Sequence, residues 1–256
     1  MGTKPGFNLL VFDSAYSSVS LRERNLEAFV TCRDLNGFFG HVISINPLAH
    51  AELVKADPRR YGPVQIIREF APGHTLIEAR VERFQWLRKL TILNALLSQL
   101  SLLRVLVRIL REVRISVVRG EDPYLNGGYA TLVARLLRRP LLIGVWGNPG
   151  GMREHTGVPI MSRLFPSVRV EAAWERFILR AADRVIVQND DNGSYVESCG
   201  VPNTSIKRFA LGNALSPVHR VPPEDRRDGA PDLQGLGLTQ GLSILCVARL
   251  NQIKMP

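Results

Sequence analysis

The chain has 256 residues, of which 45 % are hydrophobic and 22 % charged, and its formal net charge is +10. This length and composition suit one large α/β domain, or one domain with part of another, and exclude a disordered chain. Because the chain is basic, nucleic acid has to be considered as a binding partner. The sequence has no aromatic interleaving, RNP-like motif or zinc-finger spacing, so we expect no nucleic-acid partner.

Strand-like and helix-like segments alternate along residues 5–213. Short apolar runs predict strands at 7–13, 41–45, 64–67, 115–120, 140–147, 183–189 and 205–211. Helical patterns lie between them at 20–35, 47–56, 75–113, 127–138 and 168–182, with a short helix that ends near Gly200. Because strands joined by helical crossovers require a parallel sheet, residues 5–213 are predicted to form a doubly wound, Rossmann-like α/β domain.

The cysteines and the amino terminus indicate a reducing compartment. Cys32, Cys199 and Cys246 are far apart and follow no metal or C-x-x-C spacing, so we expect no metal and no other cofactor. Residues 1–16 contain too short an apolar stretch for a secretory signal, and they contain no small-residue cleavage site. We therefore expect a cytoplasmic protein.

Residues 80–119 are both basic and rich in leucine. Their Arg and Lys side chains far outnumber the acids, which are Glu82 and Glu112, and they flank the uncharged run LTILNALLSQLSLL at 90–103. That run is shorter than the roughly 18 residues of a membrane-spanning helix. Two interpretations stay open: a helix that lies on an anionic membrane surface, or a core helix with solvated arginines on its outer face.

The end of the chain predicts the start of a second domain. Residues 214–241 are rich in Pro, Gly and charge and have no periodicity, which is typical of a linker. The apolar run LSILCV then predicts a strand at 242–247. We expect residues 242–256 to be the truncated start of a C-terminal domain.

Ligands of an open parallel sheet bind beyond the carboxyl ends of its strands, where this chain carries small and polar residues. The residues that follow the expected strands are Asp13, Ser14, Asn46, Glu121, Asp122, Gly147, Asn148, Gln188, Asn189, Gly212 and Asn213. Within the glycine-dense segment 147–157, which we expect to be a loop, the N–H groups of Gly150 and Gly151 could bind an anion or a sugar hydroxyl. His155 is a weak catalytic candidate. Turn formation alone would explain the same residue types.

Several enzyme classes lack their signatures in this sequence. No G-x-G-x-x-G follows the first strand, which argues against a nicotinamide or flavin dehydrogenase, and no Walker A motif follows the glycine-dense segment. There is no G-x-S-x-G elbow for an esterase and no pair of carboxylates at glycosidase spacing.

Four passages in consistent order resemble family 4 glycosyltransferases: residues 115–147, 174–190, 200–215 and 242–256, the last reading LSILCVARLNQIKMP. The resemblance implies the GT-B architecture, in which an N-terminal Rossmann-like domain holds the acceptor and a C-terminal one holds a nucleotide-sugar donor. Arg249 and Lys254 match the pair that contacts the donor diphosphate in the family. Two cations there would stabilise the leaving group without a metal.

The chain departs from the family pattern at several positions. Ser17 and Ser18 stand where the family often has a Gly-Gly turn near the donor phosphates, although their hydroxyls could supply contacts. Gly147 stands where the corresponding strand often ends in His, and the family's acidic E-x7-E motif lies beyond Pro256.

These observations predict the acceptor-side half of a retaining glycosyltransferase. The donor would be a nucleotide sugar and the acceptor a lipid-linked or polysaccharide glycan, such as those of the cell envelope. We expect the chain to be incomplete until further sequence or a partner chain supplies the donor domain. The alternative is a non-catalytic, membrane-peripheral module that binds a sugar or nucleotide. Both place the protein in the cytoplasm or on the inner face of the plasma membrane.

Overall fold

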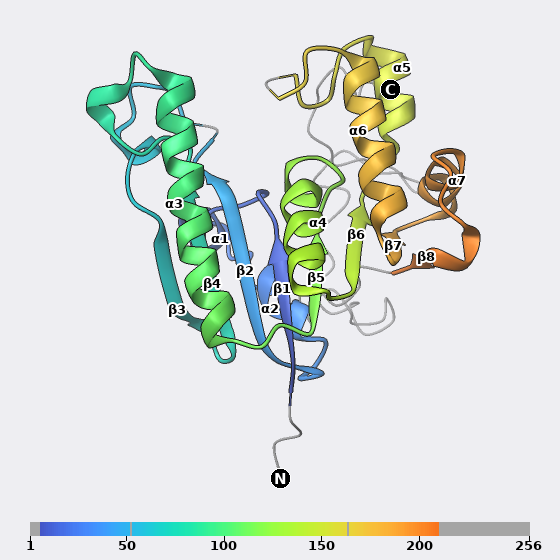
Figure 1. Ribbon diagram of the computed structural model, residues 1–256, viewed down its shortest axis with the longest axis horizontal. Coiled ribbons are helices and arrows are strands. Elements are labelled where there is room, and N and C mark those ends of the chain that lie inside the picture. Colours follow the sequence, from blue (N-terminus) through green and yellow to red (C-terminus); the bar gives the residue numbers. More distant parts are fainter. Residues whose placement is uncertain (1–5, 52, 163, 210–256) are drawn as a thin grey trace, which may run out of the picture.

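An eight-stranded sheet runs through the computed structural model, which describes residues 6–209 except 52 and 163 (Figure 1). In order across the sheet the strands are β3 (Gln65–Ala71), β4 (His74–Arg80), β2 (Phe39–Ala49), β1 (Phe7–Phe12), β5 (Val117–Gly120), β6 (Leu141–Val145), β7 (Arg184–Val187) and β8 (Ile206–Arg208). Every neighbouring pair is parallel except β3 with β4, which form an antiparallel hairpin at one edge. The predicted Rossmann-like fold class is confirmed.

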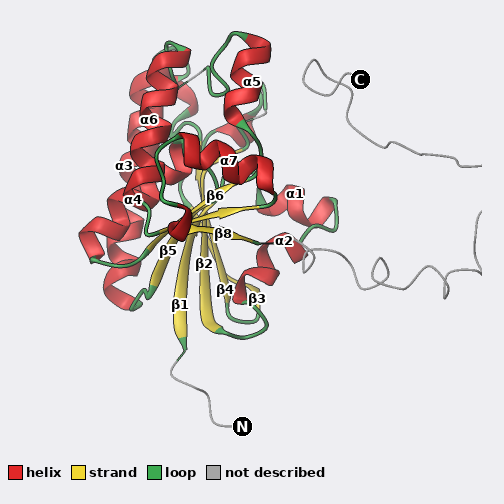
Figure 2. Cartoon of the chain, turned by 90° about the vertical axis from the view of Figure 1, so that its right-hand side faces the viewer, coloured by secondary structure: helices red, strands yellow, loops and turns green. Residues whose placement is uncertain are grey.

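Helices cover both faces of this sheet. The α-helices are α1 (Ser18–Glu23), α2 (Ala28–Thr31), α3 (Thr91–Glu112), α4 (Leu125–Leu137), α5 (Pro149–Thr156), α6 (Val168–Ala181) and α7 (Asp190–Ser198). Short 3₁₀ turns are η1 (Cys32–Asp34), η2 (Pro58–Arg60), η3 (Gln85–Leu87) and η4 (Asn203–Ser205). Figure 2 shows α3, α4 and α6 on one side of the strands and α1 and α2 on the other.

The larger part of the core fills the space between the sheet and α3, α4 and α6. Phe12 on β1 is fully buried and stacks on Tyr129 of α4, with ring centroids 5.6 Å apart. Leu102, Leu106 and Ile109 recur at helical spacing along α3 and belong to the same cluster. Because each such buried side chain contributes about 1.5–3 kcal/mol, this inner face holds α3 on the sheet.

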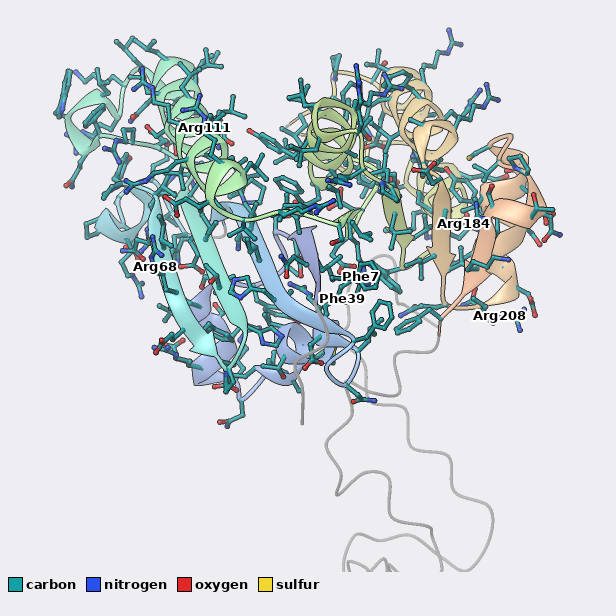
Figure 3. The ribbon with its side chains drawn as sticks, turned by 60° about the horizontal axis from the view of Figure 1, so that its bottom comes forward. Phe7, Phe39, Arg68, Arg111, Arg184 and Arg208 are labelled. Carbon is teal, nitrogen blue, oxygen red and sulfur yellow. The ribbon has the colours of Figure 1, made fainter. Side chains whose placement is uncertain are left out.

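All the parallel strands point the same way, so their amino ends lie together at one end of the sheet and their carboxyl ends at the other. Phe7 and Phe39 pair at the start of β1 and β2 and lie together at the amino end (Figure 3). The chain order reverses beside β1, whose neighbours are β2 on one side and β5 on the other. In such sheets the carboxyl ends diverge at this switch point and leave a crevice for a ligand.

The helix expected at 47–56 is wrong, because β2 continues through Pro47 to Ala49. The pairing of β2 with β4 shifts register between Asn46 and Ala49, which is a position where a strand tolerates proline. The Asn46 side chain holds this stretch by donating to the Tyr16 carbonyl at 2.9 Å and accepting from the Leu48 N–H at 3.0 Å.

The helix expected at 75–113 is also wrong over its first part, because His74–Arg80 form β4 and α3 begins only at Thr91. This strand was not predicted because polar residues interrupt its apolar run. One of them, Glu78, is fully buried because it accepts hydrogen bonds from the Ser18 N–H and from the Ser18 hydroxyl, the latter at 2.9 Å.

The helix expected at 20–35 is divided into α1, α2 and η1. Asn25 lies between α1 and α2 with φ of 53°, in the left-handed region that an asparagine tolerates and that ends a helix. The break lets α2 and η1 turn back toward the sheet, so that Arg33 in η1 is buried.

The expected linker at 214–241 and the expected strand at 242–247 lie outside the described residues.

Candidate functional site

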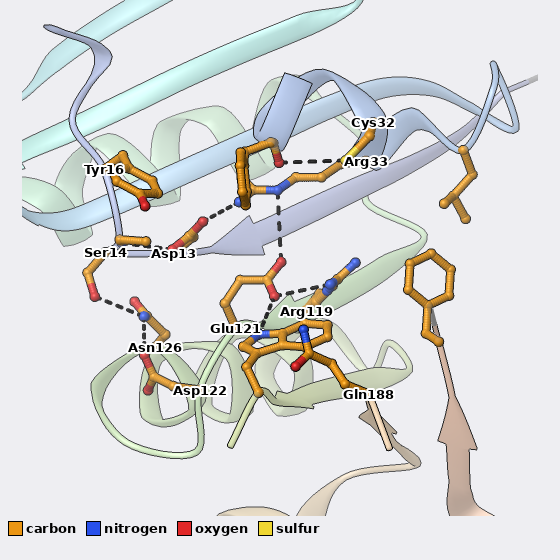
Figure 4. Close-up of a pocket in the computed structure, with 15 residues that line it drawn as sticks. Asp13, Ser14, Tyr16, Cys32, Arg33, Arg119, Glu121, Asp122, Asn126 and Gln188 are labelled. Carbon is orange, nitrogen blue, oxygen red and sulfur yellow. Dashed lines mark hydrogen bonds and ion pairs between the residues drawn. The ribbon is translucent and has the colours of Figure 1, made fainter. Parts of the chain in front are cut away.

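A cavity of about 450 Å³ opens at the switch point, beyond the carboxyl ends of β1, β5, β6 and β7 (Figure 4). Polar side chains from several elements meet there: Asp13, Ser14, Arg33, Arg119, Glu121, Asp122, Asn126 and Gln188. Aromatic residues such as Tyr16 and Trp146 complete the wall. Much of the remaining wall is apolar, including Phe29, Leu35 and Phe209. A cavity with a few convergent polar groups between apolar and aromatic walls suits a ligand such as a sugar, which has both hydroxyl groups and an apolar face.

Glu121 is held in this cavity by contacts of both its backbone and its side chain. Its backbone N–H donates to the Phe12 carbonyl at 3.0 Å, which continues the pairing of β5 with β1. Its carboxylate accepts from Arg119 and from the indole N–H of Trp146, both at 3.0 Å. The Arg119 guanidinium in turn lies 5.6 Å from the centre of the Trp146 ring. These contacts fix the orientation of Glu121 before any ligand binds.

Arg33 connects two carboxylates of the cavity from the opposite side. It is 7 % exposed, forms an ion pair with Asp13, lies 3.8 Å from Glu121 and donates to the Ser44 hydroxyl at 2.8 Å. Burial lowers the pKa of Arg33, but the charges of Asp13 and Glu121 raise it to a value above the ordinary one. The guanidinium therefore stays protonated and is a cationic partner for both side chains.

Asp122 has a different environment and a different protonation behaviour. Burial raises its pKa to about 6, while hydrogen bonds from the Tyr124 N–H, at 2.8 Å, and from the Asn126 amide oppose that shift. The charge of Asp13 raises the pKa further. A carboxyl group that titrates near 6 can hold or release a proton at neutral pH, as a catalytic acid or base must.

Asn126 completes the polar side of the cavity. Its amide nitrogen donates to Asp122 and to the Ser14 hydroxyl, the latter at 3.0 Å. Its amide oxygen is buried and has no hydrogen-bond partner among the described residues. An unpaired buried acceptor is costly, so this oxygen is the unsatisfied member of the hydrogen-bond network beside the cavity.

The structure brings together only some of the residues that the sequence singled out. Glu121 and Asp122 line the cavity, as do the strand-end residues Asp13, Ser14 and Gln188. Ser17 and Ser18 do not line it, because Ser17 caps α1 through a hydrogen bond from the Ser20 N–H and Ser18 is bound to Glu78. Asn213, Arg249 and Lys254 lie outside the described residues.

The glycine-dense segment is not the loop that we expected. Its residues from Pro149 to Thr156 form α5, which begins where the Asn148 side chain accepts from the Gly151 N–H at 3.0 Å. A Cβ at Gly150 would lie 2.5 Å from the Tyr195 ring, so close packing requires this glycine.

The other candidates near this segment also lie away from the cavity lining. Gly147 and Gly151 are not part of the lining, and His155 is exposed in the last turn of α5. Asn189 caps α7 by accepting from the Asn192 N–H at 2.9 Å. Helix starts and turns use residue types such as Asn and Gly for local reasons.

Sequence reasoning missed Arg33, Arg119, Asn126 and Trp146. Arg119 offered a signal, because it is a charged residue within the apolar strand run ISVVRG. Arg33 offered none, since its burial depends on the break at Asn25. Asn126 lies in the first turn of α4, where the helical pattern does not distinguish a cavity residue from a surface one.

Among the described residues no group of three or more His, Cys, Asp or Glu side chains could hold a metal ion. The arrangement supports hydrogen bonding to hydroxyl groups and, at Asp122, proton transfer.

Comparisons with known proteins found one family model and several solved structures that match this chain. A family model described as "Glycosyl transferase 4-like domain" matches residues 22–212. The solved structure of sucrose-phosphate synthase from Thermosynechococcus elongatus has 12 % identity, a TM-score of 0.51, and a match that covers 80 % of this chain and 48 % of that one. That likeness supports a shared fold. No curated protein matches the chain.

Two further solved structures are more distant in shape. HepE from Anabaena, in complex with UDP and glucose, matches at 11 % identity and a TM-score of 0.47, over 90 % of this chain and 50 % of that one. A putative UDP-N-acetylglucosamine 2-epimerase from Listeria monocytogenes matches at 10 % identity and 0.43, over 79 % and 45 %. The chain spans about half the length of the solved structures that it matches.

Proposed function

The chain belongs to the glycosyl transferase 4-like family, and from this membership we propose that it is the acceptor-side half of an enzyme that transfers a sugar from a nucleotide-sugar donor. The resemblance to retaining family members extends the proposal to retention of configuration at the anomeric carbon. The acceptor is a hydroxyl group of a lipid-linked or polysaccharide glycan of the cell envelope.

The cavity at the switch point, with its fixed hydrogen-bonding groups, is the observation that carries this proposal. The carboxylates of Asp13 and Glu121 are fixed by Arg33 and Arg119, and they can accept hydrogen bonds from acceptor hydroxyls without reorganising. Asp122, with a pKa of about 6, is placed in the same cavity to hold a proton of the reacting hydroxyl group.

The donor side belongs to the same proposal. Arg249 and Lys254, at the spacing of the family's diphosphate-binding pair, would stabilise the charge that develops on the leaving nucleoside diphosphate. No metal or other cofactor is then needed for that step. We propose that the rest of the donor site comes from further sequence or from a partner chain, and that these 256 residues alone transfer sugar at a negligible rate.

An apolar groove supports an acceptor with a lipid part. The groove has a volume of about 290 Å³ and lies between α4, α6 and the segment before α6, lined by Tyr124, Leu125, Gly128, Tyr129, Leu132, Leu164, Phe165 and Trp174. The segment 122–126 separates it from the polar cavity, since Asp122 and Asn126 line the cavity while Tyr124 and Leu125 line the groove. An amphiphilic acceptor could therefore place its sugar in the cavity and its apolar part in the groove.

The test is a transfer assay with radiolabelled nucleotide sugars and a membrane lipid extract as acceptor. The complete protein is expected to incorporate label from one donor into the lipid fraction, and Asp122→Asn is expected to lower that rate by about 100-fold. Lys207→Gln, at an exposed site on β8, is the control. No incorporation from any nucleotide sugar would overturn the proposal, and efficient transfer by the 256 residues alone would overturn the claim that they are half of the enzyme.

A further inference from the structure

One end of α3 and the segment before it expose an unusual concentration of large apolar side chains. This apolar tip consists of Phe84, Trp86, Leu90, Ile92, Leu93 and Leu96, all of them exposed. Trp86 is 77 % exposed and Ile92 is 78 % exposed. Figure 1 shows this end of α3 standing beyond the strands. A contiguous patch of this kind marks an interaction site rather than ordinary surface.

The apolar tip is held rigidly by one buried side chain. The Asn94 side-chain oxygen accepts from the N–H groups of Arg83 and Phe84, at 2.9 and 2.8 Å. Its amide nitrogen donates to the Phe84 carbonyl at 2.6 Å and to Glu82 at 3.1 Å. The segment before α3 is thus hydrogen-bonded to the first turn of the helix. The exposed apolar side chains therefore belong to an ordered segment.

The rest of α3 limits how this surface can meet a membrane. The helix is long and apolar enough to cross a bilayer by length and composition, and 28 % of its most apolar window is buried inside the structure. Leu102, Leu106 and Ile109 are buried in the core, so α3 cannot leave the sheet without exposing them. The apolar tip can enter a membrane interface while the remainder of the helix stays on the domain.

The charges around the apolar tip favour a negatively charged partner. Arg88 and Lys89 are exposed within it, and Arg104, Arg108 and Arg111 extend the positive surface along the outer side of α3. Glu112 is the acid on that side of the helix, and it lies 3.3 Å from Arg108. Exposed tryptophan and leucine beside cations is the combination that favours an anionic lipid interface.

We propose that the apolar tip inserts into the headgroup region of an anionic phospholipid bilayer and attaches the domain to it. The apolar side chains lie at the boundary of headgroups and acyl chains, and Arg88 and Lys89 bind lipid phosphates. If the proposed function holds, this attachment brings the cavity and the apolar groove to the surface from which a lipid-linked acceptor is drawn. The attachment itself does not depend on transferase activity.

Co-sedimentation of the full chain with vesicles tests the proposal. Vesicles of phosphatidylcholine with about 30 % phosphatidylglycerol should bind the chain at low salt, and binding should fall by about an order of magnitude in pure phosphatidylcholine or at high salt. The variant Trp86→Ser/Ile92→Ser/Leu96→Ser should bind at least about tenfold more weakly, because it removes apolar area from the interface. Arg88→Gln/Lys89→Gln should weaken binding by a similar factor.

Matched controls distinguish binding by the apolar tip from non-specific binding by other exposed apolar or cationic side chains. Val54→Ser/Leu136→Ser removes apolar side chains that are 72 % and 73 % exposed elsewhere, and Arg169→Gln/Lys207→Gln removes exposed cations elsewhere. Both controls should bind vesicles as the unchanged chain does. Equal losses in the tip variant and its apolar control would overturn the proposal.

A measurement of insertion depth needs only the unchanged chain and the conservative variant Trp86→Phe. Brominated lipids should quench the part of the fluorescence that Trp86→Phe removes, since Trp86 would lie near the acyl chains. An absence of quenching overturns the proposal. So does a concentration-dependent dimer, found by sedimentation without vesicles and abolished in the tip variant, because the tip would then bind a second copy of the chain.

Discussion

At the scale of single residues, the cavity holds two neighbouring carboxyl groups in different environments. Glu121 accepts from Arg119 and from the Trp146 indole and lies near Arg33, whereas Asp122 is buried and has a raised pKa. One faces cations, and the other faces hydrogen-bond donors of the backbone and of Asn126. This difference leads to two predictions.

Asp122 should make stability depend on pH in a defined direction. Its pKa in the folded chain is about 6 against an ordinary value of 3.8, so the folded state binds the proton more tightly than the unfolded state. The free energy of unfolding should therefore fall by about 2–3 kcal/mol as pH rises from about 4 to about 6, and then level off. Urea titrations at several pH values should show a flatter profile for Asp122→Asn. Parallel profiles would contradict the assignment.

Removing the charge of Glu121 should destabilise the domain. In Glu121→Gln the buried guanidinium of Arg119 loses its carboxylate partner, so we expect a loss of about 2–4 kcal/mol in the free energy of unfolding. The control is Glu112→Gln on the exposed side of α3, where the loss should be below about 1 kcal/mol. Equal midpoints for both variants in urea would show that Glu121 does not hold the network together.

At the scale of elements, α5 illustrates how packing overrides a local signal. The glycines of 147–157 suggested a loop, but the helix start of Asn148 and Pro149 and the approach of Tyr195 to Gly150 explain them. The Tyr195 hydroxyl also accepts from Arg153, whose guanidinium lies 2.6 Å from Glu175 of α6. Together these contacts join α5, α6 and α7.

Two adjacent glycines of α5 should respond in opposite ways to a methyl group. Gly150→Ala places a Cβ against the Tyr195 ring and should lower the free energy of unfolding by about 1–3 kcal/mol. Gly151→Ala meets only the Asn148 side chain, at 3.6 Å or more, and should raise stability by up to about 1 kcal/mol through helix propensity. Thermal unfolding of both variants checks this, and stabilisation by Gly150→Ala would contradict the packing.

The sequence predicted the strands that contain a short apolar run, whether they lie inside the sheet or at its edge. Strands at β1, β5, β6 and β7 were recognised, and with them the strand-end residues Asp13, Glu121, Asp122 and Gln188. β4 was missed because Glu78 breaks its apolar run, and its burial depends on Ser18 from a distant helix. Arg33 and Asn126 were missed for the same kind of reason. Their roles arise from contacts across the fold that no local pattern encodes.

At the scale of the whole molecule, the division of labour between two halves can be tested on this chain alone. A ligand that binds the folded state raises stability by RT ln(1 + [L]/Kd), which is about 2.7 kcal/mol at a hundredfold excess over Kd. For a domain of this size that corresponds to a rise of about 5–10 °C in Tm. An acceptor-side half should show such a rise with an amphiphilic glycoside and little with a nucleotide.

Octyl glucoside, kept below its micelle concentration, is a suitable probe because its sugar fits the cavity and its alkyl chain the apolar groove. It should raise Tm in the unchanged chain, and less in Trp174→Ala, which removes one wall of the groove. Glucose alone should act weakly, since it leaves the groove empty. If UDP raised Tm more than the glycoside did, and did so equally in Arg249→Gln/Lys254→Gln, the donor rather than the acceptor would be bound by residues 6–209. The roles of the two halves would then have to be exchanged.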